Sequence, residues 1–162
     1  MLHHRRSCRR RPAPSIPPAV LAPADALAVL GAASALVTPG RVAALVLDLA
    51  WRPLDLCLCD DDPDVEDRTR ILLDLYAGDT AGVVLAHARP QAAGGVAVTP
   101  AEARRFARLL AHGDACGAPV LDWFVLVGGC AYSLAELGEH PWRWVAPDLD
   151  IDPDIDPDAG AP

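Results

Sequence analysis

The 162-residue sequence contains no lysine, no Cys-x-x-Cys pair and no apolar run long enough to cross a membrane. Between the two ends of the chain, nine arginines stand against sixteen acidic residues, a net charge of −7 that disfavours a nucleic-acid-binding surface there. Five cysteines are an odd number, which disfavours a secreted disulfide framework and favours a reducing compartment. We therefore expect a cytoplasmic protein that does not insert into membranes.

The positive charge that the middle of the chain lacks is gathered at the N-terminal end. Five arginines lie within the first eleven residues, whereas six aspartates alternate with other residues between positions 148 and 158. Proline is frequent in both segments. This composition predicts a disordered arm over residues 1–22, one domain over residues 23–144 and a disordered tail over residues 145–162. The arm is the segment whose charge suits nucleic acid.

Hydrophobic periodicity divides the middle of the chain into alternating strands and helices. Apolar runs and period-two alternation predict strands over residues 41–50, 54–59, 82–87, 120–127 and 130–134. Helical patterns fall between or before these strands, over residues 23–37, 65–76 and 100–115. This order predicts an α/β fold with a mixed β-sheet flanked by helices on both faces.

The most distinctive residues lie where the strand over residues 82–87 ends and the next helix begins. His87 closes the apolar run, and a Gly-rich segment then leads to Thr99-Pro-Ala-Glu102. Thr99 and Glu102 have the spacing of a capping box, and Pro100 suits the first helical position. A histidine at a strand end that faces an acidic helix start can also form half of a zinc site.

Four segments, in this order, resemble the RadC family, a bacterial branch of the JAB/MPN metalloprotease-like domains. They are residues 83–90, 99–102, 117–122 and 132–138, and the similarity spans about residues 42–138. The resemblance implies a three-layer, cytidine-deaminase-like architecture. In active members it implies a zinc ion held by two histidines and an aspartate, a serine that steadies the oxyanion, and a glutamate that activates zinc-bound water.

Matched position by position, this chain keeps little of that site. His87 stands at the first histidine, but Arg89 replaces the second, and a guanidinium cannot ligate zinc. Thr99 stands at the serine position with a usable hydroxyl, and Glu102 stands at the aspartate position. The base glutamate falls near Cys57. A thiol is a poor substitute for a carboxylate that must shuttle a proton.

A Ser-Gly pair of the family is also replaced, by Gln91-Ala92. We therefore expect a pseudoenzyme that acts as a binding or structural module for an unidentified protein partner, with no cofactor. One alternative is a zinc-dependent hydrolase with a rearranged site, in which Cys57, His87 and Glu102 are ligands and Thr99 serves the oxyanion. Another is a DNA-repair-associated RadC-type factor that contacts nucleic acid through the N-terminal arm.

Several of these residues also have ordinary structural interpretations. Arg89 could bind an anion or form an ion pair with Glu102, and Cys57 could be a small buried apolar residue. His112, Asp114 and Cys116 lie close together in sequence, but alternating residues do not share a helical face. We expect them to form a helix terminus rather than a set of metal ligands.

Overall fold

The computed structural model describes residues 17–32, 38–60, 64–90 and 98–144, and the structural account is confined to them. The expectations for residues 1–16, for Gln91-Ala92 and for the acidic tail lie outside the described residues. Within the described ranges, no helix combines the length and the apolar character that crossing a bilayer requires.

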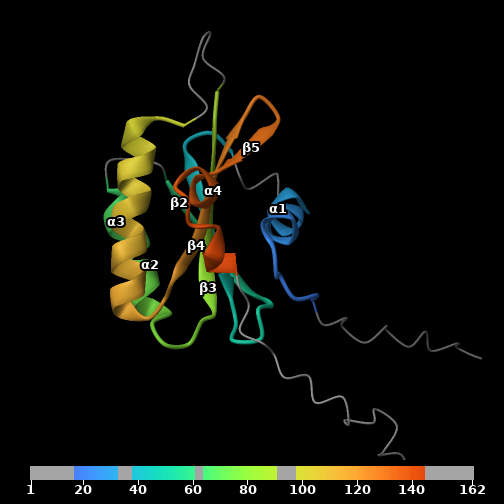
Figure 1. Cartoon of the computed structure of the whole chain (residues 1–162), viewed down its shortest axis with the longest axis vertical. Coiled ribbons are helices and arrows are strands. Elements are labelled where there is room, and N and C mark those ends of the chain that lie inside the picture. The colour runs from blue at the N-terminus through green and yellow to red at the C-terminus, as the bar shows by residue number, and fades with distance from the viewer. Residues whose placement is uncertain (1–16, 33–37, 61–63, 91–97, 145–162) are drawn as a thin grey trace, which may run out of the picture.

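Five strands form one mixed sheet with the order β2-β1-β3-β4-β5 (Figure 1). Strands β3 and β4 are parallel, and the other neighbouring pairs are antiparallel. This arrangement confirms the predicted α/β class and the mixed sheet. The strands are β1 (Arg41–Leu47), β2 (Pro53–Asp60), β3 (Gly82–Arg89), β4 (Val120–Val127) and β5 (Cys130–Ser133).

The central strands are the continuous apolar runs of the sequence, because both of their faces are covered. Strand β1 is buried from its second residue to its last, whereas the edge strand β2 shows no fully buried residue. Strand β1 ends earlier than the predicted residue 50. The Asp48 carboxylate accepts hydrogen bonds from the backbone N–H groups of Ala50 and Arg52, and this turns the chain.

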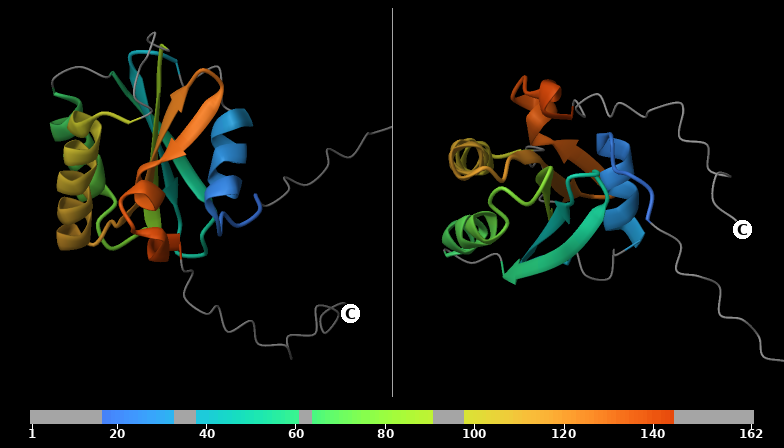
Figure 2. Two further views of the ribbon diagram at one scale, coloured as in Figure 1. Left: turned by 45° about the horizontal axis from the view of Figure 1, so that its top comes forward. Right: turned by 90° about the horizontal axis from the view of Figure 1, so that it is seen from below.

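Helices cover both faces of the sheet, as predicted. Helix α1 (Pro23–Ala32) lies against one face, and helices α2 (Val65–Leu75) and α3 (Pro100–Cys116) lie side by side against the other (Figure 2). A short helix α4 (Leu134–Leu137), not predicted, follows β5 because the Ser133 hydroxyl accepts the N–H of Glu136. A 3₁₀ turn, η1 (Pro141–Trp144), follows α4.

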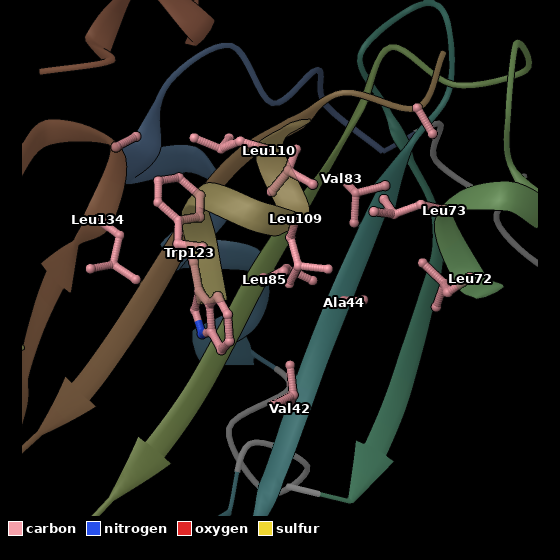
Figure 3. Packing of buried hydrophobic residues seen from close by; sticks show 14 of the residues in the cluster. Val42, Ala44, Leu72, Leu73, Val83, Leu85, Leu109, Leu110, Trp123 and Leu134 are labelled. Atoms are coloured by element: carbon pink, nitrogen blue, oxygen red, sulfur yellow. The ribbon is translucent and has the colours of Figure 1, made fainter. Parts of the chain in front are cut away.

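The sheet separates two hydrophobic cores. The core beneath α2 and α3 contains Trp123, Leu85 and Leu109, which Figure 3 shows packed together. The core beneath α1 includes Val20, which is buried and donates its N–H to the carbonyl of Trp51 over 2.6 Å. The packed body therefore begins before residue 23, inside the segment that composition had assigned to the arm.

Candidate functional site

His87 lies near the carboxyl end of β3, with Val42 of β1 beside it on one side and Val125 of β4 on the other. Its side chain is buried, with a relative exposure of 4% for the residue. It shares its face of the sheet with Trp123, and the two rings meet edge to face with centroids 5.5 Å apart. The histidine is thus enclosed by the core beneath α3.

Both ring nitrogens of His87 have partners. The indole Nε1–H of Trp123 lies 2.8 Å from Nδ1, and Oε1 of Glu102 lies 3.0 Å from Nε2. An indole N–H can only donate, so Nδ1 must be the unprotonated acceptor. The ring proton is therefore on Nε2, which donates to the Glu102 carboxylate. The geometry assigns a neutral imidazole in a single tautomer.

This tautomer is incompatible with metal ligation by Nε2. A neutral histidine that ligates through Nε2 must carry its proton on Nδ1. In this protein that proton would point at the indole N–H of Trp123, and two hydrogens would face each other. Ligation through Nδ1 would require the indole to move away. Trp123 therefore holds His87 as a hydrogen-bonding group.

Glu102 is the centre of the cluster and belongs to the first turn of α3. Its Oε2 accepts the backbone N–H of Thr99 over 2.5 Å, and its own N–H donates to the Thr99 hydroxyl over 3.2 Å. This confirms the predicted capping box. Burial by itself raises the pKa of Glu102, but the hydrogen bonds with Thr99 and, to a smaller extent, the neighbouring His87 and Arg89 outweigh it, so the pKa is lowered.

Arg89 lies two residues after His87, at the end of β3. Its Nε is 3.3 Å from Oε1 of Glu102, so Arg89 forms the ion pair with Glu102 that its position in the sequence allows. The guanidinium brings a positive charge to the place where the resemblance implies a second zinc ligand. Because Thr99 is part of the helix cap, its hydroxyl is also already engaged.

Cys57 is not brought to this cluster. On the sheet it pairs with Ala44, which pairs with Leu85, so it is offset by two residues from the row of His87. It also lies two strands away, which alone is roughly 10 Å. Burial and the nearby Asp55 carboxylate raise the pKa of the Cys57 thiol, which further disfavours a thiolate ligand. The set of Cys57, His87 and Glu102 therefore does not converge.

Asp122, in one of the segments that carry the RadC resemblance, fixes the strand on which Trp123 lies. It is fully buried and accepts hydrogen bonds from the N–H of Trp123, the hydroxyl of Ser133 and the N–H of Ala135, over 2.7, 2.7 and 3.0 Å. Its pKa is raised because burial disfavours the charged form more than these donors favour it. Asp122 ties β4 to β5 and α4, so it positions the indole.

A second cluster lies at the other end of α3. Asp74 of α2 and His112 and Cys116 of α3 place one ligand atom each within 4.8 Å of one another. His112 Nε2 is 2.8 Å from Oδ1 of Asp74. Among the described residues, these three are the histidine, cysteine and carboxylate side chains that lie close enough together to hold a metal ion.

His112, Asp114 and Cys116 lie at the carboxyl end of α3, which confirms the helix terminus that the sequence predicts. Asp114 does point elsewhere, and its carboxylate binds the guanidinium of Arg143 over 2.5 and 2.9 Å. His112 and Cys116, however, are four residues apart and share a helical face. That spacing was visible in the sequence. The third member, Asp74, comes from another helix and depends on how α2 and α3 pack.

The two clusters are thus a buried polar group around His87, built from β3, β4 and α3, and a partly exposed group around His112, built from α2 and α3. Neither contains the two-histidine set that the RadC resemblance implies. The chain matches no protein-family model, and a search of curated protein sequences likewise gives no match.

Proposed function

We propose that this chain is a divergent RadC-like JAB/MPN domain that lacks ordinary zinc peptidase activity and acts as a binding or structural module. One observation carries the proposal. His87, at the position of the first zinc ligand, accepts a hydrogen bond from Trp123 at Nδ1 and donates one to Glu102 from Nε2. The residue that should present a lone pair to zinc presents a proton to a carboxylate.

The charges around His87 favour the same conclusion. Zinc hydrolases of this kind need three protein ligands and one open position for water. Here the Glu102 carboxylate already accepts from His87 and Thr99 and lies beside the Arg89 guanidinium. A divalent cation at this point would have to displace these contacts while standing next to a positive charge.

The His87 cluster can also replace the structural link that a metal would provide. In an active site, zinc would join the end of the strand to the start of the following helix. In this chain the Glu102 carboxylate makes that connection, because it binds Arg89 and His87 of β3 and caps α3 at Thr99. A JAB/MPN-type scaffold can therefore keep its shape without zinc, which supports a role in binding rather than hydrolysis.

The test is the zinc content and the peptidase activity of the full chain, purified under reducing conditions, with His87→Ala and Cys57→Ala beside it. We expect no hydrolysis of peptide or isopeptide substrates, and the same zinc content in wild type and both variants. Zinc that is lost in both variants, together with hydrolysis by the wild type alone, would overturn the proposal in favour of a rearranged hydrolase site.

A further inference from the structure

We propose that Asp74, His112 and Cys116 bind one divalent transition-metal ion of the zinc class, at the place where the carboxyl ends of α2 and α3 meet. The proposal is independent of the His87 cluster. His112 lies ten residues after Glu102 on the same helix, which corresponds to roughly 15 Å. A metal here would clamp the two helices together and would not depend on the RadC resemblance.

The donor set is the first argument. A carboxylate, an imidazole and a thiolate are all established zinc ligands, and the thiolate disfavours magnesium and calcium. Ligand atoms of a tetrahedral zinc site lie about 3.4 Å apart. On metal binding, the 2.8 Å distance between Asp74 Oδ1 and His112 Nε2 must lengthen slightly. The distances from the Cys116 sulfur, which are at most 4.8 Å, must shorten. The Asp74 side chain is 56% exposed and can make this adjustment.

Electrostatics is the second argument. Both helices end at the cluster, and neither has a lysine or arginine in its last turn. A helix carboxyl end carries partial negative charge, which attracts cations and disfavours a carboxylate. Asp74 nevertheless lies in the last turn of α2 and adds a further negative charge there. A bound cation would offset the repulsion between Asp74 and the two helix ends. Neither last turn has a lysine or arginine that could do so.

The backbone around the three side chains is already held in place. The N–H of Gly78, just after α2, donates to the carbonyl of Gly117, just after α3, over 3.0 Å. Between His112 and Cys116, a side chain at Gly113 would come within 2.6 Å of the Ala118 carbonyl. The end of α3 is thus packed closely against the start of β4. Because the backbone that carries the ligands is already fixed, little ordering is needed when a metal binds.

The proton balance of binding is simple. In the metal-free protein the Cys116 thiol donates to the carbonyl of Gly113 over 3.5 Å. When the metal binds, that proton passes to the buffer and the sulfur–metal bond forms, while His112 ligates as a neutral imidazole. A fourth position is left for water. No oxidant or reductant takes part.

The experiment titrates the tag-free full chain, under a phosphine reductant, with Co²⁺ as a spectroscopic probe and then with Zn²⁺ against a chromophoric chelator. We expect one ion per chain and a thiolate-to-cobalt charge-transfer band in the near ultraviolet. Cys116→Ser should remove the band and weaken zinc binding by more than about 100-fold, the upper limit for loss of a second-shell group. Asp74→Asn and His112→Gln should also weaken it.

Cys130→Ser is the matched control, because Cys130 is an exposed cysteine on β5 outside the cluster. It should keep both the band and the affinity. A band that survives Cys116→Ser, or no band in the wild type, would overturn the proposal. His87→Ala separates this proposal from the proposed function. Zinc that is retained in His87→Ala but lost in Cys116→Ser supports the α2–α3 site. The reverse pattern refutes it and favours the rearranged hydrolase site.

Discussion

Among the residues that the structure describes, the pairs His87–Glu102 and His112–Asp74 have nearly the same distance but different surroundings. His87 Nε2 lies 3.0 Å from Glu102, and His112 Nε2 lies 2.8 Å from Asp74. The first pair has side-chain exposures of 5% and 11%, and the second has exposures of 30% and 56%. An indole donor and an arginine accompany His87, whereas a thiol accompanies His112.

The difference shows that a pair distance says little about what a histidine can do. The group on the other ring nitrogen fixes the tautomer, and the nearest formal charge decides whether a cation can approach. By both criteria the contacts of His87 favour the structural role that we propose for it. The His112–Asp74 pair, which has no part in the RadC resemblance, is the one that lies beside a thiol and so has the donor atoms of a ligand set.

The largest expected effect is the loss of the buried carboxylate. Glu102→Ala leaves His87 and Arg89 without their shared acceptor and removes half of the capping box at Thr99. Breaking a buried pair in this way should lower the free energy of unfolding by about 3 kcal/mol. Urea denaturation of the wild type and Glu102→Ala at neutral pH measures this loss in the free energy of unfolding.

Glu102→Gln is the control for this prediction. Its amide oxygen can still accept one of the two hydrogen bonds, so the loss should be clearly smaller than in Glu102→Ala. If both variants unfold at the wild-type midpoint, the cluster does not clamp β3 to α3, and the structural role that we assign to it is wrong.

A smaller effect is expected when the indole donor is removed. Trp123→Phe keeps the aromatic packing but loses the hydrogen bond to Nδ1 of His87, and it should cost about 2 kcal/mol because it opens space in the core. The nitrogen chemical shifts of His87 are the more direct readout. The wild type should show only the Nε2-protonated tautomer, and the variant a mixture or the other form. A mixture already present in the wild type would remove the argument that Trp123 blocks ligation.

Acid should weaken the buried cluster through Glu102. The pKa of Glu102 is lowered in the folded protein from its ordinary value of 4.5, so the unfolded chain binds more protons in that range. The contribution of Glu102 to the free energy of unfolding is therefore fully present above about pH 4.5 and is lost as the pH falls through the folded pKa. Comparing unfolding of the wild type and Glu102→Gln between neutral and acidic pH should show their difference shrinking with acid. A difference that stays constant with pH would contradict this.

Much of the framework could be predicted from the sequence, because its signals are local. The apolar runs of β1, β3 and β4 and the capping box at Thr99 and Glu102 each depend on a few neighbouring residues. The helix α4 was missed because its four residues are too few for a periodic pattern.

The arrangement of the candidate sites could not be predicted in the same way. Trp123 is thirty-six residues from His87, and its role depends on the parallel register of β3 and β4. Asp74 is thirty-eight residues from His112 and reaches it through the packing of two helices. Cys57 was proposed as a ligand from sequence matching, but the strand register places it elsewhere. Contacts between elements set these outcomes, and no local spacing encodes them.

The smallest effect is expected at the exposed pair in the absence of metal. Asp74→Ala and His112→Ala should each change the free energy of unfolding by no more than about 0.5 kcal/mol in the presence of a chelator, because exposed ion pairs contribute little. Urea denaturation with and without zinc is the measurement. In the wild type, zinc should raise the midpoint, and at one hundred times its dissociation constant the gain is about 2.7 kcal/mol. In both variants, zinc should increase the free energy of unfolding by much less than it does in the wild type.

A loss of 1 kcal/mol or more without metal would mean that His112 and Asp74 hold the two helices together by themselves, as His87 and Glu102 hold β3 to α3. The contrast between the two pairs would then disappear.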